Sequence, residues 1–359
     1  MRYKEDWEQA KQRYLEFWAM ENHDRPVLLL HGAKNPHMAP QVKAPKSLLE
    51  RWTDTGYVIE SGREQMENTV YLAESFPQIY PNLGPDIFGA SFGADLKFQE
   101  TTSFAVPFVR DWERDAVAFR QNNPWWQKIV AMTREVAADA KGDYMVGITD
   151  LHPGADGLVS IRGPEALCMD IYDCPEAFAV AKETLFPAFC SQLDTLYGIC
   201  RQNLPGSTNW MGLWHPEKWY VTSADFICMI SPEMFETLIL PELQMEIDYL
   251  KGNTIFHLDG PGALKHLDAL LQIKNLGGVQ WVYGAGQPSA RHWIPVLQKI
   301  QQAGKRINIG LKPEDIDDVC EALDPEGLSC YFDFPLTAEE AASVLKRIER
   351  IYRNKNHTF

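Results

Sequence analysis

The chain has 359 residues, a length that suits one large α/β domain with an added N-terminal region. It carries 34 Lys and Arg residues against 49 Asp and Glu residues, so its formal net charge is −15. This acid excess argues against nucleic acids and anionic membranes as partners, because both need a basic surface. Apolar residues make up 45% of the chain, which excludes disorder as its main state.

The N-terminal segment predicts a charged amphipathic helix over about the first 22 residues, with no apolar run of the kind found in signal peptides. No stretch approaches the roughly 20 apolar residues that span a bilayer. The seven cysteines are odd in number and include no CxxC pair. A disulfide framework is therefore not expected, and a cytoplasmic location is favoured.

Further along the chain, short strands alternate with helices. A strand is expected at 25–32, and residues up to 125 are interpreted as an N-terminal elaboration rich in Pro and Gly. From residue 126 the pattern is regular. The expected strands are 144–152, 206–215, 253–260, 278–284, 306–310 and 328–334, and the expected helices are 175–197, one that begins at Ser231, 263–273, 289–304, 313–323 and one that begins at Thr337.

This alternation predicts βα units and a parallel sheet. Seven or eight such strands, with a helix at the end of the chain, favour a closed (β/α)8 TIM barrel with an N-terminal helical elaboration, as a single domain over residues 1–359. An open doubly wound sheet is the alternative. It is less favoured because no GxGxxG or Walker-type loop follows any expected strand.

Residues with reactive or stacking side chains lie at the expected carboxyl ends of the strands, where barrel enzymes place their active sites. Imidazole and carboxylate groups there are candidates for acid–base catalysis, and aromatic rings for holding an organic substrate. The alternative for each is a pocket wall or an ordinary core residue. The catalytic candidates are Asp150, His152, His215 and His257, and the substrate-binding candidates are Trp214, Trp281, Tyr283 and Gln287.

His257 and Asp259 are expected to share one face of their strand, because side chains alternate with period two. Cys330 follows on the last expected strand. A His, a carboxylate and a thiolate suit zinc with one position left open. The alternatives are a structural His and a core Cys.

Three stretches in this order resemble the uroporphyrinogen decarboxylase superfamily: VSIRGPEALCMDIYDCPEAF, ADFICMISPEMFETLILPEL and NTIFHLDGPG. The segment PNLGPDIFGASFGA is similar to the N-terminal region of its less characterised members, and the likeness spans roughly residues 80 to 350. The superfamily includes decarboxylases and methyltransferases of corrinoid systems. The Arg-rich early segment of the true decarboxylases has no counterpart here, where Arg25 is the one Arg in NHDRPVLLLHGAKNPHM.

The methyltransferase branch is the closer resemblance. Its zinc-dependent members bind zinc through a strand-end His-x-Cys and a late Cys. The resemblance carries these roles to His257 and Cys330, with Asp259 where the first Cys is expected. It implies a corrinoid-linked methyltransferase that acts on a small methylated compound, with zinc as Lewis acid and a separate corrinoid-binding protein as partner. The alternatives are a lyase on a carboxylated substrate and a non-catalytic ligand-binding barrel. A homodimer is one arrangement that the sequence leaves open.

Overall fold

A computed structural model describes residues 1–356 of the chain and has a mixed α/β architecture. Its main sheet has seven strands in the order β2-β1-β11-β10-β9-β8-β7, and all neighbours in it are parallel except the antiparallel pair β1–β2. The strands are β1 Val27–Ala33, β2 Thr69–Ala73, β3 Gln78–Ile79, β4 Asp95–Phe98, β5 Ser103–Val106, β6 Met145–Val146, β7 Tyr220–Ser223, β8 Thr254–Asp259, β9 Gly278–Val282, β10 Arg306–Gly310 and β11 Leu328–Tyr331.

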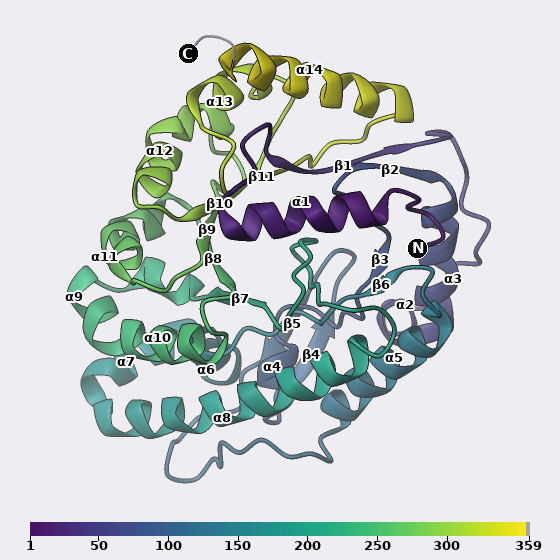
Figure 1. The fold of residues 1–359 in the computed structure, drawn as a ribbon. Helices are drawn as coiled ribbons and strands as arrows, with labels where there is room; N and C mark the ends of the chain where they lie inside the picture. The colour runs from purple at the N-terminus through teal and green to yellow at the C-terminus, as the bar shows by residue number, and fades with distance from the viewer. Residues whose placement is uncertain (357–359) are drawn as a thin grey trace.

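Helices form a layer around this sheet. Figure 1 shows α10 to α14 along one side of the molecule and α5 and α8 along another, with the strands inside. The α-helices are α1 Trp7–Ala19, α2 Leu48–Thr53, α3 Thr55–Glu67, α4 Ile87–Ala90, α5 Pro124–Ala140, α6 Gly154–Arg162, α7 Pro164–Asp173, α8 Pro175–Cys200, α9 Pro232–Met234, α10 Leu240–Tyr249, α11 Leu267–Gln272, α12 Ile294–Gln302, α13 Ile316–Ala322 and α14 Ala338–Asn356; single turns of other helix types are η1 Asp225–Met229, η2 Phe235–Ile239, η3 Pro261–His266 and η4 Ala290–Trp293.

The parallel sheet and the βα alternation of the C-terminal third are confirmed. Two predicted helix starts are also confirmed. The Ser231 hydroxyl accepts a hydrogen bond from the Met234 amide at 3.2 Å, as a capping residue does. Before α14, Thr337 and Glu340 exchange side chain-to-backbone bonds of 3.2 and 2.8 Å, the two halves of a capping box.

Closure of the sheet into a ring is not seen in the hydrogen bonds of the described residues. The main ladder runs from β2 to β7, and β3 and β6 form a separate parallel pair. A single parallel bridge, Ile148 to Asn209, continues from that pair. The structure therefore supports an α/β fold with a parallel sheet, in which the expected strand at 144–152 is reduced to the two residues of β6.

The expected strand at 206–215 is wrong in its extent. Ser207 and His215 pair in the antiparallel direction, so the segment folds back on itself. Its turn includes Gly212, whose φ of 75° lies in the left-handed region that suits glycine. The strand that pairs with β8 is instead β7, which begins at Tyr220.

Helix α1 packs across the amino-terminal ends of the parallel strands. The guanidinium of Arg306, the first residue of β10, donates hydrogen bonds to the carbonyls of Phe17 and Trp18. Asn22, just after α1, donates to the carbonyl of Pro325 at 2.6 Å, in the turn before β11. Figure 1 shows α1 crossing the centre of the molecule. The carboxyl ends of the strands, on the opposite side, are left for the site.

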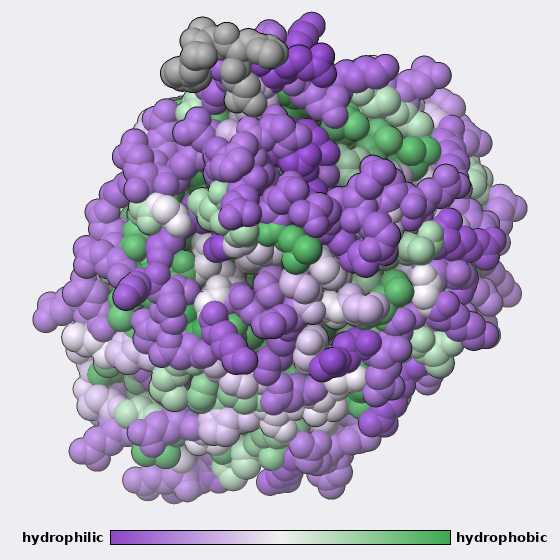
Figure 2. Space-filling view, in the orientation of Figure 1, coloured by the Kyte–Doolittle hydropathy of each residue, from purple (hydrophilic) through white to green (hydrophobic). Residues whose placement is uncertain are grey.

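On the face that Figure 2 shows, hydrophilic side chains predominate and hydrophobic ones are interspersed among them. None of the helices within residues 1–356 is long and apolar enough to cross a membrane.

Candidate functional site

Five acidic and imidazole side chains gather at the carboxyl ends of β7 and β8 and beside the start of α6. They form two groups that share Asp225, and the ligand atoms within each group lie within 4.8 Å of one another. We call them the inner group (His152, Asp156 and Asp225) and the outer group (Asp225, His257 and Asp259). His257 and Asp259 thus come together, as their spacing on one strand predicts.

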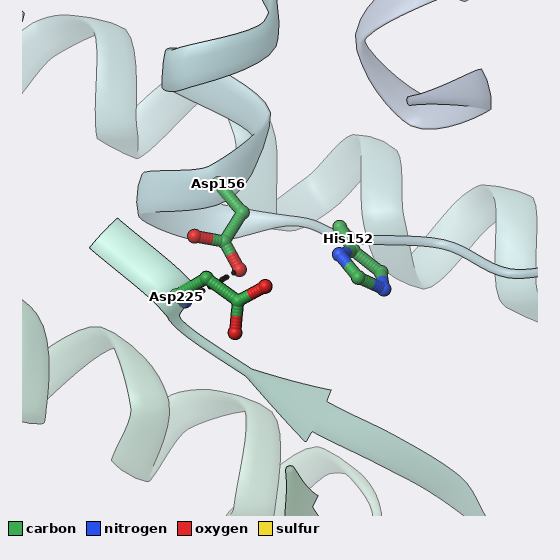
Figure 3. A group of neighbouring side chains, drawn as sticks. All are labelled: His152, Asp156 and Asp225. Carbon is green, nitrogen blue, oxygen red and sulfur yellow. Dashed lines mark hydrogen bonds between the residues drawn. The ribbon is translucent and has the colours of Figure 1, made fainter. Parts of the chain in front are cut away.

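Asp156 anchors the inner group. Its Oδ2 accepts hydrogen bonds from the Ser223 hydroxyl at 3.2 Å and the Asp225 amide at 3.0 Å, and its Oδ1 accepts one from the Phe226 amide at 3.0 Å. Figure 3 shows its carboxylate, on α6, beside Asp225, which follows the end of β7. The side chain of Asp156 therefore fixes the start of η1 and, with it, the position of Asp225.

His152 lies on the loop before α6 and faces these carboxylates (Figure 3). Its Nε2 is 2.9 Å from Oδ1 of Asp150. Burial lowers the pKa of His152, but the charge and hydrogen bond of Asp150, together with Asp156 and Asp225, outweigh burial and raise the pKa to about 10. The imidazole is therefore a cation at neutral pH, and a cationic imidazole is not a metal ligand.

Asp225 is exposed at the open side of the cluster, yet its pKa is raised to about 6. Desolvation by the surrounding protein is the largest cause, and the charge of Asp156 adds to it, whereas His257 and His152 lower it. A carboxyl with this pKa is mostly ionised at neutral pH and gains from a nearby cation. Asp225 belongs to both groups, so the cationic His152 is what makes the outer group the better candidate for a metal centre.

Two further carboxyl groups lie behind the cluster on α10. Glu242 and Glu246 are buried, and within residues 1–356 neither oxygen of Glu242 has a hydrogen-bond partner. Burial raises the pKa of Glu242 to about 7, against the opposing charge of Lys182 at 3.8 Å, and raises that of Glu246 strongly. Gly154, at the start of α6, has a φ of 60°, in the left-handed region that suits glycine, and a Cβ there would be in ordinary contact with both side chains at 3.4 Å.

A cavity of about 490 Å³ opens beside the outer group. His257 and Gln280 form part of its wall, and Trp210, in the turn after Asn209, packs edge-on against the His257 ring at 5.4 Å. Its lining includes the aromatic residues Tyr71, Phe76, Trp210, Tyr331 and Phe332 and the acid Asp333, and among residues 1–356 neither a Lys nor an Arg lines it.

Cys330 does not join the predicted metal set. Its neighbours on β11 face the other way: the Ser329 hydroxyl accepts a hydrogen bond from Asn308 of β10 at 3.0 Å, and Tyr331 lines the cavity. Side chains alternate along a strand, so the thiol of Cys330 points to the helix layer, where it is fully buried in the apolar core. Burial raises the pKa of this thiol well above its ordinary value. A thiolate from Cys330 is therefore not available to a metal at His257.

Trp214 and His215 lie away from the cluster, in the part of the hairpin that turns back under α1. The Trp214 ring packs against Trp7 at 5.8 Å, within an apolar cluster that includes α1. The His215 ring lies 4.9 Å from Trp18, and its Nδ1 accepts a hydrogen bond from the Glu217 amide at 2.9 Å. Burial lowers the pKa of His215 to about 4, so it is neutral at physiological pH.

The remaining predicted substrate residues lie outside the cavity. Trp281 is fully buried and packs against Trp293 at 5.2 Å, on the opposite face of β9 from Gln280. Tyr283 is half-buried, and Gln287 lines a separate surface groove together with Arg291. The aromatic rings that do line the cavity were not among the predicted substrate residues. Trp210 comes from the expected strand at 206–215, Tyr331 and Phe332 come from the last expected strand, and the other two come from the N-terminal region.

Several site residues were missed from the sequence. Asp225 follows the run Trp219-Tyr220-Val221-Thr222-Ser223, whose aromatic and β-branched residues are a strand signal. Gln280 is an amide within an apolar strand, which is itself a sign of a polar partner inside the sheet.

No protein-family model and no curated protein sequence matches the chain. Among solved structures, it is similar to a methyltransferase from Methanosarcina mazei, with a TM-score of 0.61 and 13% sequence identity. The match covers 96% of this chain and 99% of that chain. At this identity the likeness shows a common fold over nearly the whole length, and the activity has to be argued from the site.

Proposed function

We propose that the protein is a corrinoid-linked methyltransferase of the uroporphyrinogen decarboxylase superfamily, with the architecture of a (β/α)8 barrel. The observation that carries the proposal is the outer group, a His and two carboxylates at the carboxyl ends of parallel strands, next to an aromatic cavity. The fold shared with a methyltransferase over 96% of the chain supports it. A separate protein would supply the corrinoid, because a cavity of about 490 Å³ suits only a small organic ligand.

The donors of the outer group fit a divalent metal such as zinc. Zinc accepts imidazole nitrogen and carboxylate oxygen, and three protein ligands with an open position are typical of its catalytic sites. Because the set has no thiolate, it also suits harder metals such as manganese. A bound metal would act as a Lewis acid that polarises the heteroatom of the substrate.

The charge of the cavity selects against anionic substrates. No Lys or Arg of the described part of the chain lines it, and burial lowers the pKa of its His31, which is therefore neutral at pH 7. Asp333 adds a carboxyl group at the wall. Within residues 1–356, a polycarboxylate of the kind that the decarboxylase branch uses would find no Lys or Arg there to balance its several charges. We propose a neutral or cationic O-, N- or S-methyl compound, held against Trp210, Tyr331 and Tyr71.

In the proposed reaction, the bond between the methyl carbon and the heteroatom breaks, and its electron pair stays on the heteroatom. A reduced corrinoid on the partner protein would supply the electron pair for the new bond to the methyl carbon. His257, Asp259 and Asp225 would hold the metal, which would supply Lewis-acid chemistry. For a neutral substrate, His152, protonated and paired with Asp150, would supply the proton that the heteroatom takes up and would regain it from solvent. A cationic substrate leaves as a neutral amine or sulfide and takes up no proton.

Methylation of reduced cobalamin is the test. The purified protein, loaded with zinc or manganese, is mixed with cob(I)alamin and a panel of methanol, methylated amines, methyl sulfides and methyl carboxylates. We expect the absorbance change of methylcobalamin with at least one neutral or cationic compound, and its loss in His257→Ala. Carbon dioxide release from a carboxylated tetrapyrrole, with no methyl transfer from any compound, would establish the lyase instead. Binding without turnover would indicate a non-catalytic barrel.

A further inference from the structure

A row of polar side chains crosses four neighbouring parallel strands at one level. His257 of β8, Gln280 of β9, Asn308 of β10 and Ser329 of β11 are register partners in turn. Gln280, Asn308 and Ser329 are at most 4% exposed. Ile255, the next residue on the same face of β8 as His257, is apolar and fully buried. A buried polar row in an apolar interior is costly unless every member is hydrogen-bonded.

Every neighbouring pair in this row is bonded. His257 Nδ1 lies 2.5 Å from Oε1 of Gln280, and Nε2 of Gln280 lies 2.7 Å from Oδ1 of Asn308. Nδ2 of Asn308 lies 3.0 Å from Oγ of Ser329, whose hydroxyl lies 2.9 Å from the carbonyl of Ile307. The row therefore ends on the Ile307 carbonyl, which can only accept a hydrogen bond.

That last group fixes the direction of all the others. A carbonyl cannot donate, so the Ser329 hydroxyl donates to Ile307 and must accept from Asn308. The amide of Asn308 therefore turns its NH₂ to Ser329 and its oxygen to Gln280. By the same reasoning, Gln280 turns its NH₂ to Asn308 and its oxygen to His257. An amide oxygen accepts, so Nδ1 of His257 must carry the proton.

We infer that Ser329, Asn308 and Gln280 are positioning residues that hold neutral His257 in its Nδ1–H tautomer. This tautomer leaves the lone pair on Nε2, the nitrogen that is free to bind a ligand at the outer group. The inference deepens the proposed function, and the role of the row in presenting Nε2 to a ligand rests on that function. The tautomer itself can be measured without metal, substrate or corrinoid.

The experiment is nitrogen-15 NMR of the metal-free full chain with labelled histidine, at about pH 8, where imidazole is ordinarily neutral. Comparison with His257→Gln assigns the signals of His257. In the wild type we expect a pyrrole-type shift for Nδ1 and a pyridine-type shift for Nε2. A mixture of tautomers, or the Nε2–H form, in the wild type would overturn the inference.

Ser329→Ala is the decisive variant, because it changes a side chain that has no bond to His257. Without the hydroxyl, both amides are free to turn over together and present an NH₂ to Nδ1. We expect a mixture of the two tautomers and, if half the molecules hold the competent one, about a twofold loss of zinc affinity. Adding Gln280→Glu should restore the Nδ1–H form, because both oxygens of a carboxylate accept.

Thr222→Val is the matched control. The Thr222 hydroxyl is also fully buried on a strand of this sheet, but it pairs with Thr254 at 3.2 Å and not with the row. It should leave the His257 tautomer unchanged, and circular dichroism should show that all variants are folded. If Ser329→Ala keeps the pure Nδ1–H form, the row does not set the tautomer. If the tautomer behaves as expected but no metal binds, the proposed function fails and the inference stands.

Discussion

Replacing Asp156 with Asn would test how the cluster is assembled. The carboxylate accepts three hydrogen bonds, two of them from the backbone amides of Asp225 and Phe226, and the residue is only 9% exposed. An amide has one oxygen. Whichever way it turns, its NH₂ faces either the Asp225 or the Phe226 amide, and one buried N–H loses its acceptor.

The expected cost follows from that count. One unsatisfied buried donor lowers the free energy of unfolding by about 1–3 kcal/mol, and the remaining bonds weaken because their acceptor is no longer charged. We therefore expect a loss of about 2–4 kcal/mol in urea unfolding. Because η1 carries Asp225, we also expect weaker metal binding, measured by competition with a chelator.

Asp115→Asn is the control. The Asp115 carboxylate also accepts two backbone amides, from Arg110 at 2.6 Å and Asp111 at 3.0 Å, but in an exposed turn. It should change neither unfolding nor metal binding appreciably, because water replaces the lost acceptor. Wild-type stability together with wild-type metal affinity in Asp156→Asn would refute the role assigned to this side chain.

Three further predictions concern single groups. The pKa of His152 is raised to about 10, so its stabilising effect is complete below about pH 6.5 and is lost as the pH rises through 10. The stability advantage of the wild type over His152→Gln in urea unfolding should therefore shrink between pH 6.5 and 10. A constant difference would contradict the ion pair. Burial raises the pKa of Glu242 to about 7, so its ionisation costs stability as the pH rises from about 4.5 through 7. Glu242→Gln should therefore be more stable than the wild type by up to about 3 kcal/mol at pH 8, and not at pH 4. Equal stability at pH 8 would argue against a desolvated carboxyl group. Cys330→Ala should lower the free energy of unfolding by about 1 kcal/mol through lost packing and leave the metal affinity unchanged, whereas lost metal binding would restore the thiolate as a ligand.

Most of the fold was predictable because its signals are local. The C-terminal strands are short β-branched runs that alternate with capped helices, as at Ser231 and Thr337. The segment at 206–215 was wrongly predicted as one strand because its aromatic and apolar residues are typical of strands, whereas Gly212 allows the chain to turn back. That error hid β7 and therefore Asp225.

The site was predictable only where strand periodicity decides it. His257 and Asp259 are two residues apart on β8, and period two alone places them together. The same rule could not orient Cys330, because both faces of β11 are buried and its apolar residues do not tell the two faces apart. The partnership of His257 with Gln280 depends on the register between strands, which no local pattern in the sequence encodes.

Metal stoichiometry in matched variants is the most direct test of the central claim. The untagged protein is stripped with a chelator, reloaded with zinc or manganese, dialysed and measured by elemental analysis beside His257→Ala, Asp225→Asn, Asp259→Asn and Cys330→Ala. We expect about one metal ion per chain in the wild type and in Cys330→Ala, and a large loss in the other three variants. No stoichiometric metal in the wild type, or an unchanged content in His257→Ala, would contradict a metal centre at the outer group.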